Sequence, residues 1–489
     1  MNILLLTVLC VIEIAFAWIS IPRRPIVREW SLARLIINGG EILVFLVLLL
    51  SPGIDLGMRF RLLFLLLGIR TVLAAVLCLT RRKVEKEKKT AGIIFSLFGS
   101  VLLFAFGSIP SFLFADFQGL PTTGQYEVGM AQAILVDDSR EEAFETDGSS
   151  REVPAYFFYP EGGDAGEKYP LIFFSHSAFG YYQSNMSTYM ELASHGYVVV
   201  SLEHPYHALY TKDTDGKIIL SDQTFMQDIQ RINGNEAAEE EIFEISSGWM
   251  KLRLADCDFA VDSVKEAAQR GTLTACFSVS EKDREKVTAA LSMIDSGKIG
   301  FMGHSLGGAA AVTIGRRRED IGAVIDFDGT MLGEIEEVAD GVDIIREEPY
   351  DTPLLSFDSE AHHESRAACA EQGVPYANNV VLAHAADGYS TYIAGTGHMN
   401  YTDLPLFSPF LASMLGTGDV DAEACILKMN EITLAFFDCY LKESGTFQVE
   451  EGYYLLRDGN QAEKEAAQQA KQMTLDLVSY QACQGSEEP

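Results

Sequence analysis

The chain has 489 residues, 48% of them hydrophobic, which is long enough for a full-size catalytic core and a further segment. The first 115 residues hold 13 basic and 6 acidic residues, and the remainder holds 24 basic and 63 acidic residues. A segment this acidic is not expected to bind nucleic acid, because the phosphates of the nucleic acid would repel it.

The first 115 residues contain four long apolar stretches, each close to the ~20 residues that a helix needs to cross a bilayer. They are Leu4–Ile19, Leu35–Leu50, Leu62–Leu79 and Ile93–Phe114. We therefore expect a membrane domain of about four transmembrane helices at residues 1–115, and a multi-pass location in the cell membrane.

The connecting loops orient this membrane domain. Residues 22–34 and 80–90 are rich in Lys and Arg, whereas residues 116–124 contain neither. Because basic loops stay in the cytoplasm, we expect the large C-terminal domain to be extracytoplasmic. The sequence AFA at residues 15–17 resembles a signal-peptidase site but lacks a basic n-region. Whether residues 1–19 are retained or cleaved stays open, and cleavage would leave three spans.

Three charged residues, Glu13, Glu41 and Arg70, lie within the apolar stretches, where a charge is costly and often paired. One interpretation is a site for transport or sensing. The other is an ion pair that locks the bundle, which we favour because three residues do not make a pathway.

From about residue 125, short apolar runs alternate with helical patterns, which predicts a mostly parallel α/β sheet with helices on both faces. Several runs are almost wholly apolar, as in strands that are covered on both sides. The predicted strands are residues 169–177, 197–204, 298–305, 322–329, 353–360 and 378–385. The predicted helices include Gln183–His195, Gly248–Ala268 and Gly308–Arg318.

These patterns divide the second part of the chain. We expect a linker and first strand at residues 116–149, a catalytic domain at 150–445 and a polar tail at 446–489. Residues 211–247 are long for a connection and include the acidic run NEAAEEEIFE. They form either a lid over the sheet or a pair of solvated surface helices.

The stretch KIGFMGHSLGGAAAV, residues 298–312, places a serine between a predicted strand and a predicted helix. The pattern Gly-x-Ser-x-Gly is typical of a nucleophile elbow, a turn so tight that the residues two before and two after the serine must lack side chains. Gly303 and Gly307 meet that demand. Ser305 would then lie at a helix N-terminus, where the amide of Leu306 can stabilise an oxyanion.

A nucleophilic serine needs a base, usually an imidazole. In this kind of fold the chain order is serine, acid, histidine, so the base should follow Ser305. The histidines after that point are His362, His363, His384 and His398. The first three lie in or near predicted strands, where a histidine is usually a packed core residue or an exposed surface residue and not a catalytic base. His398 lies in a Gly-rich loop, a common place for catalytic groups.

Two aspartates are candidates for the acid, because each ends a predicted strand after the serine. Asp328 follows Ser305 by 23 residues, and Asp358 ends the next strand. Asp326 alternates with Asp328 and should point to the other face of the sheet. From the residues alone both candidates stay open.

Several motifs in order resemble the plasma-type (isoform II) platelet-activating-factor acetylhydrolases, a branch of the α/β-hydrolases. They are YPLIFFSHSAFGYYQSNMSTYMELASHGYVVVSLEHPYH, KIGFMGHSLGGAAAV, GAVIDFDGTML, PLLSFDSE and GTGHMNYTDL, and they cover most of residues 150–445. By motif, Ser305 matches the nucleophile, Asp328 the acid and His398 the base. The second oxyanion donor falls on Ala178, just after Ser177, which stands where the family has glycine.

This resemblance implies a serine ester hydrolase that forms an acyl-enzyme and acts on short or oxidised acyl chains of glycerophospholipids, a role in lipid degradation. It implies no metal and no cofactor, and the sequence shows no convincing metal-ligand cluster. Two alternatives use the same residues differently. An acyltransferase would pass the acyl group to an alcohol, and a membrane receptor or scaffold would hold an inactive hydrolase-like domain. The physiological substrate and the oligomeric state stay open.

Overall fold

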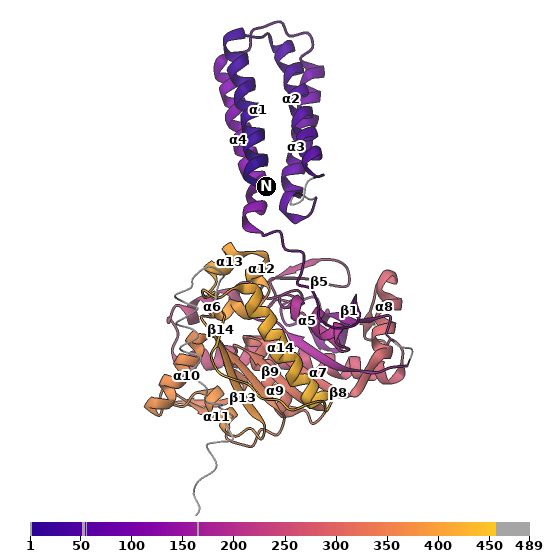
Figure 1. Ribbon diagram of the computed structural model, residues 1–489, viewed down its shortest axis with the longest axis vertical. Coiled ribbons are helices and arrows are strands. Elements are labelled where there is room, and N and C mark those ends of the chain that lie inside the picture. Colours follow the sequence, from indigo (N-terminus) through magenta and orange to yellow (C-terminus); the bar gives the residue numbers. More distant parts are fainter. Residues whose placement is uncertain (1, 51–53, 55, 164–165, 456–489) are drawn as a thin grey trace, which may run out of the picture. The chain divides into compact units, whose positions relative to one another are not determined.

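A computed structural model describes residues 2–50, 54, 56–163 and 166–455 (Figure 1). The chain forms two compact units. The first comprises residues 1–118 with 406–412, and the second comprises residues 119–405 and those from 413 onward. Most of the predicted tail, from residue 456, lies outside the described residues.

The first unit is a bundle of four helices that run side by side (Figure 1). Each is long and apolar enough to cross a membrane. The helices are α1 (Asn2–Arg23), α2 (Val27–Leu48), α3 (Met58–Thr80) and α4 (Thr90–Leu113). In α1 the buried residues Leu5, Leu9, Glu13 and Ala17 recur every fourth position, so one stripe of the helix faces its neighbours.

Buried charges join three of these helices. Arg34 on α2 lies 2.6 Å from Glu13 on α1, and Arg70 on α3 contacts Glu13 and lies 2.9 Å from Glu41 on α2. Arg34 also donates to Ser100 Oγ on α4 at 2.7 Å. The pairing that we favoured for Glu13, Glu41 and Arg70 is confirmed, and Arg34 is a partner that the sequence did not reveal.

The described part of the second unit is built on a ten-stranded sheet in the order β14-β13-β12-β9-β8-β3-β4-β2-β1-β7. The strands from β14 to β4 are parallel, and β2, β1 and β7 are antiparallel. The strands are β1 (Glu127–Glu141), β2 (Ser150–Glu161), β3 (Tyr169–Ser175), β4 (Val198–Leu202), β7 (Phe277–Ser278), β8 (Ile294–His304), β9 (Ile321–Phe327), β12 (Leu354–Asp358), β13 (Gly388–Ala394) and β14 (Tyr453–Tyr454).

Helices cover both faces of this sheet. Ile299 and Phe301 of β8 belong to the same buried apolar cluster as α7 (Glu239–Arg270) and α9 (Leu306–Arg317). Between them Gly300 faces Phe437 of α14 (Ala422–Leu441), and since strand residues alternate, α14 covers the opposite face. The other helices of this unit are α5 (Met186–Ser194), α6 (Gln223–Asn233), α8 (Glu281–Met293), α10 (Glu360–Gln372) and α11 (Ala377–Ala383), with 3-10 turns η1 (Leu332–Glu334) and η2 (His398–Tyr401). The short helices α12 (Leu404–Phe407) and α13 (Pro409–Met414) hold most of residues 406–412, which belong to the first unit.

Two segments differ from the expected secondary structure. Residues 378–385, predicted as a strand, lie mostly in helix α11, and the strand follows as β13. The strand prediction for these residues is wrong, because a short apolar run does not distinguish a buried strand from a buried helix. Residues 446–455, assigned to the tail, belong to the fold, because Phe447 and Val449 are buried and β14 pairs with β13.

The segment considered as a lid, residues 211–247, has regular structure. It holds most of the hairpin of β5 (Tyr210–Lys212) and β6 (Ile218–Leu220), then α6 and the first turns of α7. A second small hairpin joins β10 (Ile335–Ala339) to β11 (Val342–Ile345). A lid function for residues 211–247 stays a prediction.

Candidate active site

Ser305 lies in a strained turn between β8 and α9. Its backbone has φ 57° and ψ −123°, a conformation that costs energy for a residue with a side chain. A Cβ on Gly303 would lie 2.2 Å from the carbonyl oxygen of Gly307, and one on Gly307 would lie 1.9 Å from that of Ser175. The two glycines therefore allow the sharp turn that presents Ser305 at the carboxyl end of β8.

Asp328 directly follows β9, the strand next to β8 in the sheet. Its side chain is 3% exposed, and its carboxylate accepts hydrogen bonds from His398 Nδ1 at 2.6 Å, His362 Nδ1 at 3.0 Å and the Ser359 amide. Burial alone would raise the pKa of Asp328, but the bonds from His362 and His398 hold it well below its usual range. Asp328 is therefore a carboxylate at neutral pH.

His398 opens the turn η2 that follows β13. Its side chain is 40% exposed. The ring bonds to Asp328 through Nδ1, and among the described residues Nε2 has no hydrogen-bond partner, so it can face a substrate. The ring of His304, the residue before the serine, lies 4.6 Å from the His398 ring, and its Nε2 lies 3.0 Å from the His398 carbonyl oxygen. Between described residues, no hydrogen bond joins Ser305 Oγ to His398; such bonds are often long in ligand-free enzymes.

Asp358, the alternative acid, lies in a different environment. Its carboxylate contacts the Arg366 guanidinium and lies within 3.4 Å of the Ser356 and Ser390 hydroxyls. Asp326 is fully buried and accepts from the Gly329 amide at 3.0 Å. Of the three aspartates, it is Asp328 that the structure brings to His398.

The two amides predicted as oxyanion donors border the same apolar cluster. Leu306 is a buried member of this cluster and Ala178 packs against it. Phe179, next in the loop, has φ 58° and donates its amide to the His207 carbonyl at 2.9 Å. Within the described residues, the amides of Leu306 and Ala178 have no hydrogen-bond partner, which leaves them available to a ligand.

The sequence did not predict the role of Arg253, which holds the loop before Ala178. This arginine on α7 is fully buried and donates to the His176 carbonyl at 2.6 Å and the Ser177 carbonyl at 3.2 Å. Burial lowers its pKa to about 9. The signal available in the sequence was an arginine on the apolar face of a long predicted helix. His362 was also missed as a partner of Asp328.

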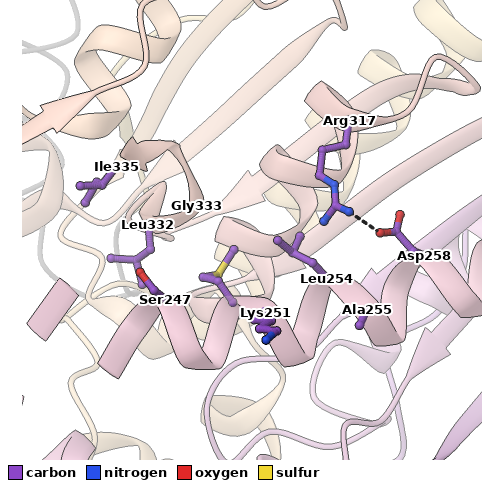
Figure 2. Close-up of a pocket in the computed structure, with 10 residues that line it drawn as sticks. Ser247, Lys251, Leu254, Ala255, Asp258, Arg317, Leu332, Gly333 and Ile335 are labelled. Carbon is purple, nitrogen blue, oxygen red and sulfur yellow. Dashed lines mark ion pairs between the residues drawn. The ribbon is translucent and has the colours of Figure 1, made fainter. Parts of the chain in front are cut away.

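A cavity of about 460 Å³ lies beside helix α7 (Figure 2). It is lined by residues of α7, α9 and η1, including Met250 and Leu332, with the ion pair between Arg317 and Asp258 at 3.0 Å. Ser305, Asp328 and His398 are absent from its lining. In the described part of the chain, no cluster of His, Cys, Asp and Glu is arranged to hold a metal.

Residues 120–455 match the family described as platelet-activating factor acetylhydrolase, isoform II. The chain belongs to this family. The predicted membership is thus confirmed, and the parallel sheet with helices on both faces is the α/β-hydrolase fold of platelet-activating factor acetylhydrolases of this type. The four apolar helices at residues 2–113 precede the matched region.

Curated relatives share low sequence identity with part of the chain. The platelet-activating factor acetylhydrolase of Bos taurus is 24% identical over 288 residues, which are 56% of this chain and 58% of the relative. The Cavia porcellus protein of the same name is 24% identical over 309 residues, 60% of this chain and 62% of the relative. The chain thus spans less than two thirds of these relatives.

A solved structure, a ferulic acid esterase from Streptomyces cinnamoneus, is also similar. It is 18% identical with a TM-score of 0.47, and the likeness covers 68% of this chain and 95% of the esterase.

Proposed function

We propose that this chain is a membrane-anchored serine ester hydrolase with Ser305 as nucleophile, His398 as base and Asp328 as acid. One observation carries the proposal: the 2.6 Å contact between His398 Nδ1 and Asp328 Oδ2, at the strand end next to the elbow of Ser305. The membership in an acetylhydrolase family supports the same reaction class.

The mechanism follows from the hydrogen bonds of His398. Because Asp328 is a carboxylate, His398 keeps its proton on Nδ1 and leaves Nε2 as a base for the Ser305 hydroxyl. Ser305 then attacks the ester carbonyl, and the amides of Leu306 and Ala178 stabilise the oxyanion. The alcohol leaves with the proton from His398, and water activated by the same imidazole releases the acid. Asp358 takes no part in the reaction, because its carboxylate is paired with the Arg366 guanidinium.

The relatives and the bundle support a lipid-ester substrate class. Proteins named platelet-activating factor acetylhydrolase resemble this chain over its catalytic part, so we assign short or oxidised acyl esters, including those of phospholipids. The four helices that fit a membrane span would keep the enzyme beside its lipids.

We place the catalytic domain outside the cytoplasm, on the basis of the basic residues 22–34 and 80–90. Protease added to intact cells should then digest the domain. Protection of the domain until the cells are lysed would place it inside.

The function is tested with the full chain purified in detergent. Wild type should react covalently with a fluorophosphonate probe and hydrolyse p-nitrophenyl acetate faster than esters of long acyl chains, whereas Ser305→Ala should do neither. A wild-type protein that fails to label would favour the receptor or scaffold. Product transfer to an added alcohol in preference to water would favour the acyltransferase.

A further inference from the structure

Asp328 binds two imidazoles, although a catalytic triad needs one. His398 Nδ1 lies 2.6 Å from Oδ2, and His362 Nδ1 lies 3.0 Å from Oδ1. His362 stands in the first turn of α10, whose N-cap Ser359 also donates its amide to Oδ1. The second imidazole is therefore fixed by the fold on the opposite oxygen of the same carboxylate.

A chain of hydrogen bonds behind His362 defines its neutral tautomer. Tyr376 Oη lies 2.9 Å from His362 Nε2, and Thr330 Oγ1 lies 3.5 Å from the same Oη. Burial raises the pKa of Tyr376, so the phenol stays protonated and can donate to Nε2. An imidazole that accepts at Nε2 carries its proton on Nδ1, where it donates to Asp328. Neutral His362 thus holds the carboxylate in place and leaves its charge to His398.

The charges around His362 show what its protonation would change. The groups that face it or border its site are Asp328 at the end of β9, Asp358 on β12, His398 on η2, His363 and Arg366 on α10 and Tyr376 before α11. Asp358 lies 3.7 Å from His362 Nδ1, but Arg366 already balances its charge. A proton added to His362 would therefore be balanced mainly by Asp328.

We propose that His362 is a positioning residue that adjusts the triad to pH: neutral, it orients Asp328 for His398, and protonated, it withdraws the charge of Asp328 from His398. The inference rests on the proposed triad of Ser305, His398 and Asp328. In the transition state His398 becomes a cation that Asp328 must stabilise. A second cation on the same carboxylate weakens that stabilisation, so the enzyme loses activity in acid twice, once for each imidazole.

The predicted signature is the steepness of the pH profile. When one histidine must be neutral, kcat/KM falls 10-fold per pH unit on the acid side. When two coupled histidines must be neutral, the fall is steeper and approaches about 100-fold per unit. A side chain that merely fills space would not change this slope.

The experiment compares the full chain with variants on p-nitrophenyl acetate between pH 5 and 9. Wild type should show the steep acid limb. His362→Phe should have a lower rate at the optimum, because Asp328 loses a positioning hydrogen bond, and its acid limb should fall only 10-fold per unit. Tyr376→Phe removes the donor to Nε2 of neutral His362, so its steep limb should begin at higher pH. His363→Phe is the matched control, because His363 stacks on Tyr392 with the ring centroids 4.1 Å apart and should follow wild type.

The outcomes separate this inference from the proposed function. An acid limb of 10-fold per unit in wild type, or an unchanged steep limb in His362→Phe, overturns the role of His362 even when Ser305→Ala is inactive. Activity retained by Ser305→Ala would instead overturn the triad. If His362→Phe does not fold, His362→Gln and Tyr376→Phe supply the same comparison, and a Tyr376→Phe profile identical to wild type contradicts the inference.

Discussion

Replacing Asp328 by asparagine should reverse the tautomer of His398. The Oδ1 side of Asp328 accepts from two donors, the Ser359 amide and His362 Nδ1. Because the Ser359 amide is fixed by the backbone, the oxygen of the introduced carboxamide must face it. The NH₂ group of the carboxamide then takes the position of Oδ2, 2.6 Å from His398 Nδ1, where it can only donate. His398 has to accept at Nδ1 and carry its proton on Nε2.

A histidine with its proton on Nε2 cannot take the proton of Ser305. The corresponding change in another serine hydrolase lowers kcat by about 10⁴-fold with the geometry intact, which corresponds to about 5 kcal/mol of transition-state stabilisation. Asp328→Asn should therefore lower kcat by about 10⁴-fold and leave KM nearly unchanged.

Asp358→Asn is the matched control, since it makes the same chemical change one strand away. It would leave the buried Arg366 guanidinium without its carboxylate, and breaking a buried ion pair costs about 3–5 kcal/mol of stability. This variant should melt at a lower temperature but keep its kcat per folded molecule within about 10-fold of wild type.

Both variants are purified as the full chain in detergent, and thermal unfolding establishes the folded fraction of each. Initial rates on p-nitrophenyl acetate then give kcat and KM, with Ser305→Ala as the blank. If Asp358→Asn loses its turnover while folded Asp328→Asn stays near wild type, the assignment of the acid is wrong.

Three further changes test the neighbourhood of the site. Gly307→Ala should abolish activity and lower the Tm, because its Cβ would lie 1.9 Å from the Ser175 carbonyl oxygen; an active, stable variant would contradict the tight elbow. Arg253→Met should lower kcat by about 10²-fold at similar KM, because it releases the loop that bears the proposed oxyanion donor Ala178. Arg253→Lys should recover part of this loss, and equal kcat in all three proteins would refute this role. Burial raises the pKa of Asp403 to about 7 in the fold, above its unfolded value of about 3.9, so the native state binds the extra proton and stability falls as pH rises between these values. Between pH 5 and 7 the unfolding free energy of Asp403→Asn should therefore fall by about 2 kcal/mol less than that of wild type. The variant should show a smaller decrease in Tm over this range, and an equal decrease in both proteins would show that Asp403 is not the cause.

Local constraints explain why the sequence could predict where the candidate residues lie in the fold. Gly303 and Gly307 flank Ser305 because the turn has no room for a Cβ at these two positions. Five consecutive residues are therefore enough to predict the elbow. Asp328 directly follows β9 and His398 closely follows β13. Neighbouring parallel strands end at the same edge of the sheet. The strand order therefore brings them together, and the motif resemblance pointed to the same pair.

The residues that were missed depend on contacts distant in the chain. His362 reaches Asp328, 34 residues earlier, because α10 begins directly after β12, and its neighbour His363 points elsewhere, onto Tyr392. Arg253 meets the loop at His176 from a helix 77 residues later. Two adjacent histidines, or an arginine in a long helix, look alike in sequence whichever contact they make.

In the proposed membrane anchor, the buried charges of the bundle impose an order on its insertion. Glu13 enters with the first helix, Arg34 and Glu41 with the second and Arg70 with the third. Each is costly to insert alone, on the order of 3 kcal/mol for a charge at the centre of a span. Since Glu41 has its ion-pair partner in Arg70, the second helix is neutralised only when the third emerges from the ribosome. The first three helices are therefore expected to leave the translocon as one hydrogen-bonded group rather than singly.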